Sequence, residues 1–447
     1  NETNGSLKYI LRLLENSVNS LAKDLRAITR IAKAAILQDL CPESMGASVK
    51  NIAPAAKSLQ ALKKGMIIFM IDLQESRKKI DEVDQKLLEL FEYRMQLAKD
   101  VAAYKRMTGK AVYDPEREKE KLVALEAMVK EEQNKKAVAA FFSQIMSLGR
   151  RLQYSLLGTR DCFGFQEVDK IRTDSHTKIA YYGEKGSYTE QAMQEYFNKE
   201  VTGISMGTFA EVMQAVKEGK AEYGVLPIEN SSTGSLSDIY DLLAEYNNTI
   251  IGEHVVKVEH CLWGIPGARL SDITKVYSHR QGLLQCSDFL KQYPKIRPVE
   301  GGSTAGCAKR ILEEGDITQA AIASRIAGEY YGLQLLQESI HKEANNATRF
   351  IIISNLKMYQ KGADSTSICF ELPHKTGSLY HMLSHLIYNN INMTRIESRP
   401  VPDKAFEYRF FIDLEGCINQ PVIQNALYSI KEEAMNMKIL GCFLPVR

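Results

Sequence analysis

Apolar residues recur at helical spacing in the first strongly patterned part of the chain. Between Ile71 and Met107 the sequence has no Gly or Pro, and apolar residues return every three or four positions. They are Ile80, Val83, Leu87, Leu90, Phe91, Leu97, Ala98 and Val101. Thr108-Gly109 ends this pattern, and Asp114-Pro115 is typical of the N-cap and first position of a second helix. A third apolar series is Phe141, Ile145, Leu148 and Leu152. We therefore predict an all-helical domain over residues 70–160.

The pattern changes over residues 178–355, where short apolar runs alternate with polar loops and helices. Runs typical of strands cover 179–182, 223–228, 276–277 and 320–324, and residues 302–305 cap a further helix. Such alternation predicts an α/β fold with a mostly parallel sheet. Ligands of such folds bind at the C-terminal ends of the strands.

A third pattern covers residues 356–447. Strands are expected at 365–372, from Met393, at 407–414 and at 438–443, with one helix ending at Tyr388 and another over 422–435. The order βαββαβ predicts a small ferredoxin-like domain.

Two segments carry no periodic pattern that assigns a role. Residues 161–177 are polar and aperiodic, which predicts a linker. Residues 1–69 read as helix and hold ten Lys and Arg against five Asp and Glu. A basic composition is typical of a transit peptide, yet this segment carries several acids and has no cleavage-like signature. The other interpretation is a natural start at Met66 or Met70, and we assign this extension no function.

Composition removes several classes of function. The chain has 447 residues, 45% of them hydrophobic, and a net charge of +2, which suggests about three domains and calls for neither nucleic acid nor a membrane surface. Eight cysteines are scattered without a C-x-x-C pair, which favours reduced thiols and a cytoplasmic location. The eight histidines show no metal-ligand spacing, so we expect no metal.

Cations lie on the apolar face of the first predicted helix. Arg94 and Lys105 are eleven positions apart and differ by about 20° around the helix, so they share a face. A lone helix charge usually belongs to a solvated face. Cations on an apolar stripe instead need anionic partners. Arg77 is rotated by about 100° from that face, so one ligand meets all three cations only if helices of two chains interlock.

In the α/β segment, small polar residues gather in the loops that precede helices. Such helix starts favour anions, although each loop alone is also explained by N-capping. Thr348-Arg349 precedes the apolar run 351–353 and adds a hydroxyl and a guanidinium. Together the loops and this pair predict a site for a small dicarboxylate.

The helical domain resembles the all-helical chorismate mutases, whose two chains intertwine as a dimer. The matching positions are Arg77, Arg94, Lys105, Asp114, Arg117, Glu118 and Gln153. The resemblance implies that Arg77 and Arg94 clamp the two carboxylates of chorismate. It implies that Lys105 and Gln153 donate to the breaking ether oxygen, and that Glu118 holds the ring hydroxyl. Gly149 stands where some members have serine, which weakens one accessory contact.

The α/β segment resembles the prephenate dehydratases, which have a two-lobed, periplasmic-binding-like α/β fold. The ordered motifs are G-x-x-G-S-Y, E-N-S-x-x-G-S, S-H-x-Q, S-T-A, A-A-I-A-S and T-R-F. The resemblance implies Thr348 as the acid or hydrogen-bond donor and Arg349 as a carboxylate ligand. Further implied contacts come from Glu229, Asn230, Ser231, Ser303, Thr304 and Phe350. Glu184 and Arg280 replace a common proline.

The C-terminal domain resembles the ACT regulatory domain of these dehydratases. The motifs are Lys-Thr-Gly-Ser-Leu at 375–379 and Glu-Ser-Arg-Pro at 397–400. The resemblance implies an L-phenylalanine effector near Gly377, Ser378, Leu379, Glu397 and Ser398, although a plain dimerisation module remains an alternative.

Taken together, the resemblances imply a bifunctional chorismate mutase–prephenate dehydratase, a homo-oligomer that needs no cofactor and makes phenylpyruvate from chorismate through prephenate. One alternative is a dehydratase, of prephenate or arogenate, whose helical domain only dimerises. Another is a phenylalanine-sensing binding protein with inactive catalytic domains.

Overall fold

A computed structural model describes residues 73–157, 162–197, 201–343, 345–402, 404 and 406–446. The extension over residues 1–69 therefore lies outside the described residues. Within the described part, no helix is both long and apolar enough to cross a membrane.

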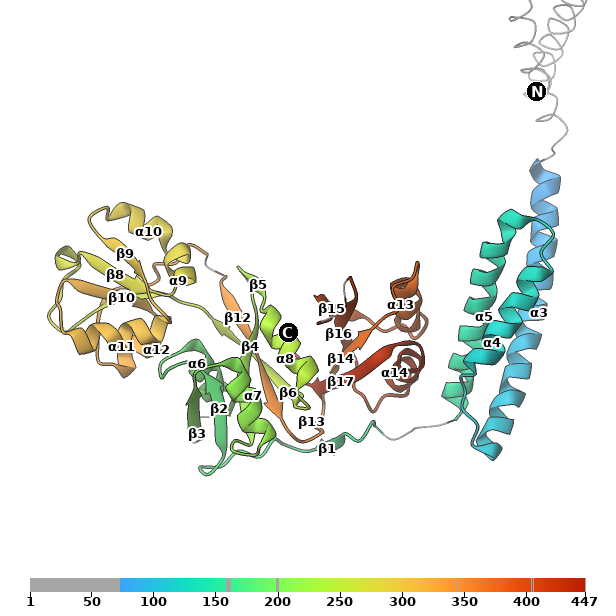
Figure 1. The fold of residues 1–447 in the computed structure, drawn as a ribbon, viewed down its shortest axis with the longest axis horizontal. Helices are drawn as coiled ribbons and strands as arrows, with labels where there is room; N and C mark the ends of the chain where they lie inside the picture. The colour runs from blue at the N-terminus through green and yellow to red at the C-terminus, as the bar shows by residue number, and fades with distance from the viewer. Residues whose placement is uncertain are drawn as a thin grey trace, which may run out of the picture. The chain divides into compact units, whose positions relative to one another are not determined.

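Helices alone form the first patterned region, as predicted (Figure 1). They are α3 (Leu73–Thr108), α4 (Pro115–Ala127), a short 3-10 helix η3 (Glu132–Asn134) and α5 (Lys135–Leu156). Asp114 is the N-cap of α4 and accepts from the backbone N–H of Arg117 at 3.0 Å, with Pro115 at the first helical position. The chain divides into two compact units within α3, one ending at Arg94 and the other beginning at Met95.

Two sheets build the α/β segment, which confirms the two lobes expected for it (Figure 1). The first lobe contains β2 (Lys178–Tyr182), β3 (Thr202–Met206), β4 (Tyr223–Asn230), β5 (Gly234–Ser235), β6 (Thr249–Lys257) and β12 (Ala347–Ser354), with helices α6 (Tyr188–Phe197), α7 (Phe209–Lys217) and α8 (Ser237–Glu245). The second lobe contains β7 (Cys261–Gly264), β8 (Lys275–Ser278), β9 (Arg297–Glu300), β10 (Gln319–Ala323) and β11 (Gln334–Gln337), with η4 (Leu270–Asp272), α9 (Arg280–Gln285), α10 (Ser287–Gln292), α11 (Thr304–Glu314) and α12 (Arg325–Tyr330).

The prediction of mostly parallel sheets is wrong, because both sheets are mixed. Strands β2, β3 and β4 are parallel, and so are β8, β9 and β10. Strand β12 runs antiparallel to both β4 and β6, and β7 runs antiparallel to β10 and β11. The chain leaves the first lobe after β6 and returns as β12, so the start of β12 lies beside the C-terminal end of β4.

The C-terminal segment has the predicted βαββαβ order. Its elements are β14 (Ser365–Glu371), α13 (Ser378–Tyr388), β15 (Met393–Pro400), β16 (Tyr408–Glu415), α14 (Pro421–Glu433) and β17 (Met435–Phe443). The sheet order β15-β16-β14-β17 is that of a ferredoxin-like domain. The segment expected to be a linker contains β1 (Gln166–Val168), which pairs with β13 (Met358–Gln360).

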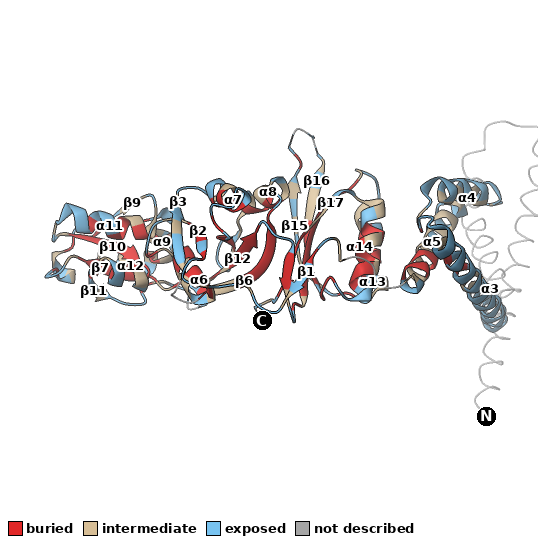
Figure 2. Ribbon diagram, turned by 90° about the horizontal axis from the view of Figure 1, so that it is seen from below, coloured by how far each residue is buried: buried red, intermediate tan, exposed pale blue. Residues whose placement is uncertain are grey.

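The C-terminal domain and the first lobe share one ten-stranded sheet. The junction is a pairing of Gly441 on β17 with Ile250 on β6. A Cβ on Gly441 would lie 1.9 Å from the carbonyl oxygen of Ile250, so only glycine allows this approach. Phe411 and Leu440 from the C-terminal domain pack in the same core as Ile351 of the first lobe. Figure 2 shows buried residues along these strands, whereas α3 is largely exposed.

Candidate active sites

The two arginines expected to clamp a dicarboxylate lie on α3 in the first compact unit. Arg77 is exposed and Arg94 is partly buried. Apolar side chains of α3 between Leu73 and Arg94 are also exposed, including Ile80, Leu87 and Leu90 at 46–63%. An apolar helix face of this kind is normally covered in the assembled protein.

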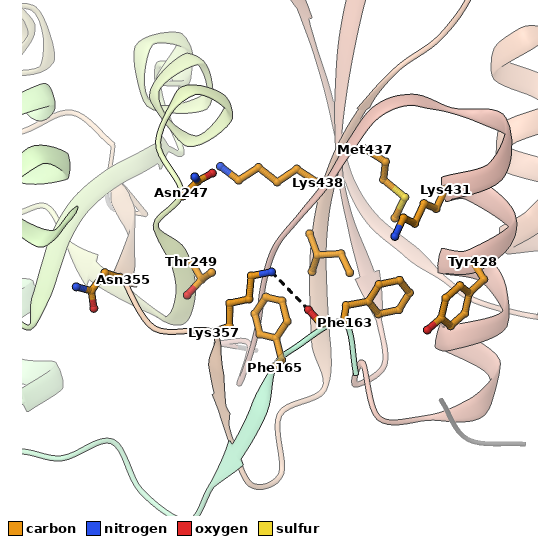
Figure 3. Close-up of a pocket in the computed structure, with 11 residues that line it drawn as sticks. Phe163, Phe165, Asn247, Thr249, Asn355, Lys357, Tyr428, Lys431, Met437 and Lys438 are labelled. Carbon is orange, nitrogen blue, oxygen red and sulfur yellow. Dashed lines mark hydrogen bonds between the residues drawn. The ribbon is translucent and has the colours of Figure 1, made fainter. Parts of the chain in front are cut away.

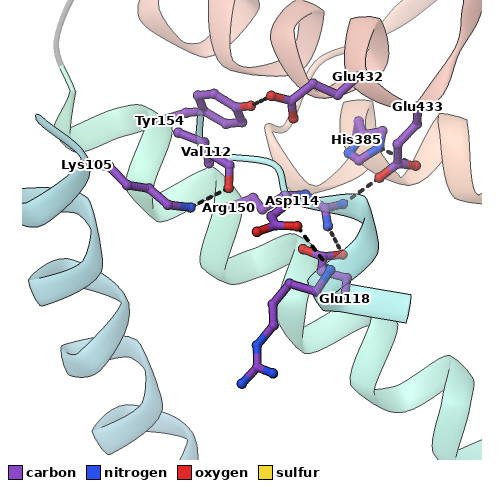
Figure 4. Close-up of polar contacts among 10 residues, drawn as sticks. Lys105, Val112, Asp114, Glu118, Arg150, Tyr154, His385, Glu432 and Glu433 are labelled. Atoms are coloured by element: carbon purple, nitrogen blue, oxygen red, sulfur yellow. Dashed lines mark hydrogen bonds and ion pairs between the residues drawn. The ribbon is translucent and has the colours of Figure 1, made fainter. Parts of the chain in front are cut away.

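Lys105, at the end of α3 in the second unit, is directed at the turn before α4 (Figure 4). Its Nζ donates to the carbonyl oxygen of Val112 at 2.6 Å. Burial lowers the pKa of Lys105, while the charges of Asp114 and Glu118 oppose that shift. Lys105, Asp114 and Glu118 are therefore close enough to interact electrostatically.

Arg150 of α5 is the central cation of this region and was missed in the sequence. Its guanidinium is hydrogen-bonded to Glu118 of α4 and to Glu433 of α14 (Figure 4). It also lies over the ring of Tyr113, 4.8 Å from the centroid. Burial opposes the charge on Arg150, but the hydrogen bond and charge of Glu118 raise its pKa. The sequence could have indicated Arg150 as a site residue, because it precedes Gln153 by three residues and so lies on the same face of the helix.

A cavity of about 550 Å³ adjoins this cluster and is lined by Glu118, Arg150, His385 and Glu433, among others. Lys105 and Gln153 are not among its lining residues. Gln153 is nevertheless buried, and its Oε1 has no hydrogen-bond partner among the described residues. A buried polar atom without a partner is unusual and is expected where a ligand or partner chain completes a site.

In the α/β segment, the structure joins the E-N-S and T-R-F motifs directly. Thr348 lies opposite Asn230 in the β12–β4 ladder. Asn230 Nδ2 donates to Thr348 Oγ1 at 2.9 Å and to Asn346 Oδ1 at 2.9 Å. Asn230 Oδ1 in turn accepts from the Ser232 hydroxyl at 2.7 Å. Ser231 Oγ binds the backbone of β12 by accepting from the N–H of Ala347 at 3.0 Å.

A chain of hydrogen bonds continues from this cluster into the second lobe. Gln285 Nε2 donates to Ser232 Oγ at 2.8 Å, and Gln285 Oε1 lies 2.8 Å from His260 Nε2. Burial lowers the pKa of His260 to about 4, so its imidazole is neutral near pH 7. A neutral ring that donates from Nε2 fits the amide oxygen of Gln285.

Arg349 lies on the opposite face of β12 from Thr348, because successive strand residues alternate. Its guanidinium is 3.5 Å from Glu229 and 3.3 Å from Glu253. Glu229 also lies 3.3 Å from Arg395 of the C-terminal domain. Phe350 is buried in the core of the first lobe. The structure therefore groups Arg349 with Glu229 and separates both from the Thr348 hydroxyl.

Ser303 and Thr304 lie at the start of α11 in the second lobe. Ser303 is its N-cap and accepts from the N–H of Gly306 at 2.9 Å.

In the first lobe, Asn346 was missed in the sequence although it adjoins the T-R-F motif. It is buried beside Thr348, and its Nδ2 has no partner among the described residues. Its position immediately before β12 could have indicated that Asn346 belongs to the site.

The residues expected to bind an effector occupy two elements of the C-terminal domain. Gly377 is the N-cap of α13 with φ of 84°, a left-handed conformation that favours glycine, and Ser378 and Leu379 follow it. Glu397 and Ser398 lie on β15. Glu397 accepts a hydrogen bond of 2.8 Å from Ser235, the last residue of the E-N-S-x-x-G-S motif. The structure thus links Glu397 to the first lobe.

Comparison with protein families identifies both catalytic parts. The family "chorismate mutase type II" matches residues 76–154, and "prephenate dehydratase" matches residues 179–358. The chain is thus an enzyme with a helical mutase domain followed by an α/β dehydratase domain. A bifunctional chorismate mutase/prephenate dehydratase of Pseudomonas aeruginosa is 34% identical over 377 residues, which cover 83% of this chain and 97% of the relative. This chain belongs to the family of bifunctional chorismate mutase/prephenate dehydratases.

Solved structures resemble the part of the chain beyond the helical domain. A prephenate dehydratase from Arthrobacter aurescens in complex with L-Phe is 29% identical, with a TM-score of 0.56, and the match covers 60% of this chain and 90% of that one. GqqA, described as a novel type of quorum quenching acylase, is 32% identical with a TM-score of 0.55, and the match covers 60% of this chain and 98% of that one.

Proposed function

We propose that residues 70–160 rearrange chorismate to prephenate, and that residues 178–355 convert prephenate to phenylpyruvate, as one enzyme of L-phenylalanine biosynthesis in the cytoplasm. Residues 356–447 are then an ACT domain that receives L-phenylalanine, and residues 161–177 connect the two catalytic domains. The observation that carries this proposal is the hydrogen bond from Asn230 to Thr348, which joins two motifs 118 residues apart in one cluster.

For the mutase step, Arg77 and Arg94 hold the two carboxylates, and Lys105 and Gln153 donate to the ether oxygen as its bond to the ring breaks. The rearrangement is intramolecular and needs no acid or nucleophile, so orientation and charge supply the catalysis. Glu118 accepts from the ring hydroxyl, and Arg150 fixes the Glu118 carboxylate by an ion pair. Asp114 and Arg117 shape the turn that carries Glu118.

This mutase site requires a homodimer. The apolar face of α3 is exposed in the single chain, with Ile80 at 58% and Leu90 at 63%. A second α3 covering that face would bury it and bring a partner arginine to the ligand, as in the intertwined mutases that this domain resembles. The proposal follows from the exposed face and from the angular separation of Arg77 and Arg94.

For the dehydratase step, Thr348 protonates the hydroxyl that leaves the ring of prephenate. Loss of CO₂ supplies the electron pair that aromatises the ring, and the expelled hydroxyl takes a proton and leaves as water. Because Asn230 donates to Thr348 Oγ1, the hydroxyl hydrogen of Thr348 is free for the leaving group. The accepted hydrogen bond also makes the weakly acidic hydroxyl a better donor. Solvent then returns the proton to Thr348.

Ser231, Ser303, Thr304 and Asn346 are proposed as neutral donors to the substrate. We assign Arg349 the task of holding Glu229 and Glu253, because direct binding of substrate would require it to leave both carboxylates. Phe350 anchors the strand in the core. None of these steps calls for a cofactor.

Regulation is proposed from the C-terminal domain. L-phenylalanine would bind near Gly377, Ser378 and Leu379 and near Glu397 and Ser398. The hydrogen bond from Ser235 to Glu397 supplies a physical link between that effector site and the dehydratase loop.

The test is to supply chorismate to the purified full-length chain and to follow prephenate and phenylpyruvate. Successive appearance of both compounds is expected. Absence of prephenate, with added prephenate still converted, would reduce the helical domain to a dimerisation element. Faster turnover of arogenate than of prephenate would change the assigned substrate.

A further inference from the structure

A basic hollow of about 670 Å³ lies where three parts of the chain meet (Figure 3). Phe163 and Phe165 come from the segment that enters the α/β domain, and Lys357 comes from the turn between β12 and β13. Lys431 lies on α14 and Lys438 on β17 of the C-terminal domain. This lysine hollow, defined by Lys357, Lys431 and Lys438, contains none of the catalytic or effector residues assigned above.

The contacts of the three lysines go to carbonyl oxygens and aromatic rings. Lys357 Nζ donates to the carbonyl oxygen of Phe163 at 3.5 Å and lies 5.8 Å from the ring centroid of Phe165. Lys431 Nζ lies 5.8 Å from the ring centroid of Phe163. Lys438 Nζ donates to two carbonyl oxygens at the C-terminal end of α8, that of Leu243 at 2.7 Å and that of Tyr246. These partners are carbonyl oxygens and aromatic rings, so none of them carries a full negative charge that would neutralise a lysine of the hollow.

Positive charge accumulates in the hollow without acidic groups to balance it. None of its described lining residues is Asp or Glu. Burial lowers the pKa of Lys438, and the nearby cations Arg409 and Lys357 lower it further, against an opposing effect of Cys369. An anion bound in the hollow would offset the repulsion between these neighbouring cations.

Aromatic surface lies beside this charge. The Phe163 ring stacks on Tyr428 with centroids 4.6 Å apart and an interplanar angle of 30°. Figure 3 shows the Phe165 ring beside the amino group of Lys357, and the Phe163 ring on the side of the hollow where Lys431 lies. A ring packed on these faces would place an attached carboxylate among the lysines. A volume of this size suits a small organic ligand.

We propose that the lysine hollow binds a ring-bearing carboxylate that lacks an amino group. An α-ammonium would stand among three cations with no acidic lining residue to receive it, so the hollow discriminates against L-phenylalanine. The ligand class follows from the hollow alone and does not depend on the activities proposed above. A bound ligand would hold the segment at Phe163, the first lobe and the C-terminal domain together.

The test compares two probes that differ only in the amino group, 3-phenylpropanoate and L-phenylalanine. Calorimetry on the full-length chain should show 3-phenylpropanoate binding that is weakened about tenfold in the double variant Lys357→Met/Lys431→Met. Binding of L-phenylalanine should be the same in both proteins. The matched control is Lys361→Met, an exposed lysine outside the hollow, which should bind both probes as the unaltered chain does.

Three results would overturn the proposal. Equal affinity for 3-phenylpropanoate in the double variant and the unaltered chain would place its binding elsewhere. Displacement of 3-phenylpropanoate by inorganic sulfate at equal concentration would show a general anion site without a ring preference. A loss of L-phenylalanine affinity in the double variant would show that the hollow does not select against the amino group. Retained mutase and dehydratase rates would show that the double variant is folded.

Discussion

Ser235 Oγ donates a hydrogen bond of 2.8 Å to the carboxylate of Glu397, and this contact joins the last residue of the E-N-S-x-x-G-S motif, in β5, to strand β15 of the C-terminal domain. Ser235 follows Asn230 by five residues, and Asn230 holds the Thr348 hydroxyl. A displacement of Glu397 would therefore be passed to the Asn230–Thr348 cluster through the short segment between Asn230 and Ser235.

Substitution of Ser235 by Ala should weaken inhibition of dehydration by L-phenylalanine about fivefold, because one hydrogen bond of about 1 kcal/mol no longer links the two sites. The measurement is the L-phenylalanine concentration that halves the dehydratase rate. Coupling is reciprocal, so prephenate should also lose part of its effect on L-phenylalanine affinity. Ser237→Ala, in the first turn of α8, is the control. Unchanged inhibition in Ser235→Ala would rule out this route.

Ser235→Ala tests regulation by L-phenylalanine more directly than a substitution of Gly377 does. A Val at Gly377 would be strained by φ of 84° whether or not an effector binds there. Loss of inhibition in Gly377→Val would thus mix ligand contact with backbone strain.

Thr348→Ala should lower the rate of prephenate dehydration roughly 10²-fold and leave the mutase unchanged. The loss should reflect chemistry rather than unfolding, because Asn230 Nδ2 keeps its hydrogen bonds to Asn346 Oδ1 and to the Ala347 carbonyl. Steady-state rates with added prephenate and with chorismate separate the two activities. Thr348→Ser retains the hydroxyl and should keep most of the rate. A normal dehydratase rate in Thr348→Ala would remove Thr348 as the acid.

Lys105→Ala should lower mutase activity by about 10²–10³-fold while dehydration of added prephenate continues. Lys105 would supply the charge that stabilises the breaking ether bond. Its hydrogen-bond acceptor Val112 and the charged groups around it belong to the helical and C-terminal domains and not to the α/β segment. Lys110→Ala removes an exposed lysine from the turn that follows α3 and is the matched control. Equal losses of both activities would mean that the substitution disturbs the whole fold.

Local patterns predicted the elements well, and the reason is visible in individual residues. Asp114 and Pro115 begin α4 because capping depends on neighbours within one turn. The predicted helix ending at Tyr388 and the strand from Met393 agree with α13 and β15. Alternation and helical periodicity are properties of short segments, so a single sequence contains them.

Pairing between distant segments was not predictable in this way. The antiparallel direction of β12 depends on the return of the chain from the second lobe, which no local pattern encodes. The helix face of Arg150 was predictable, but its partners Glu118 and Glu433 were not, because they lie 32 and 283 residues away. The separation of Thr348 from Arg349 was predictable, because adjacent strand residues face opposite sides. Treating the two as one site overlooked that alternation.

Acid should destabilise the protein through His260, whose pKa burial lowers to about 4. The folded ring faces Gln285, the hydroxyl of Tyr188 and the imidazole of His341, and it lacks an acidic partner among these groups. In the unfolded chain the pKa is near 6.5, so between about pH 4 and 6.5 the unfolded state binds more protons. The free energy of unfolding should therefore fall as the pH is lowered through this window, by up to about 1.4 kcal/mol per pH unit.

His260→Gln should flatten this dependence, whereas His374→Gln, at an exposed position, should preserve it. Denaturant unfolding at a series of pH values measures the slope, and an equal slope in His260→Gln and the unaltered chain would show that His260 does not control acid stability.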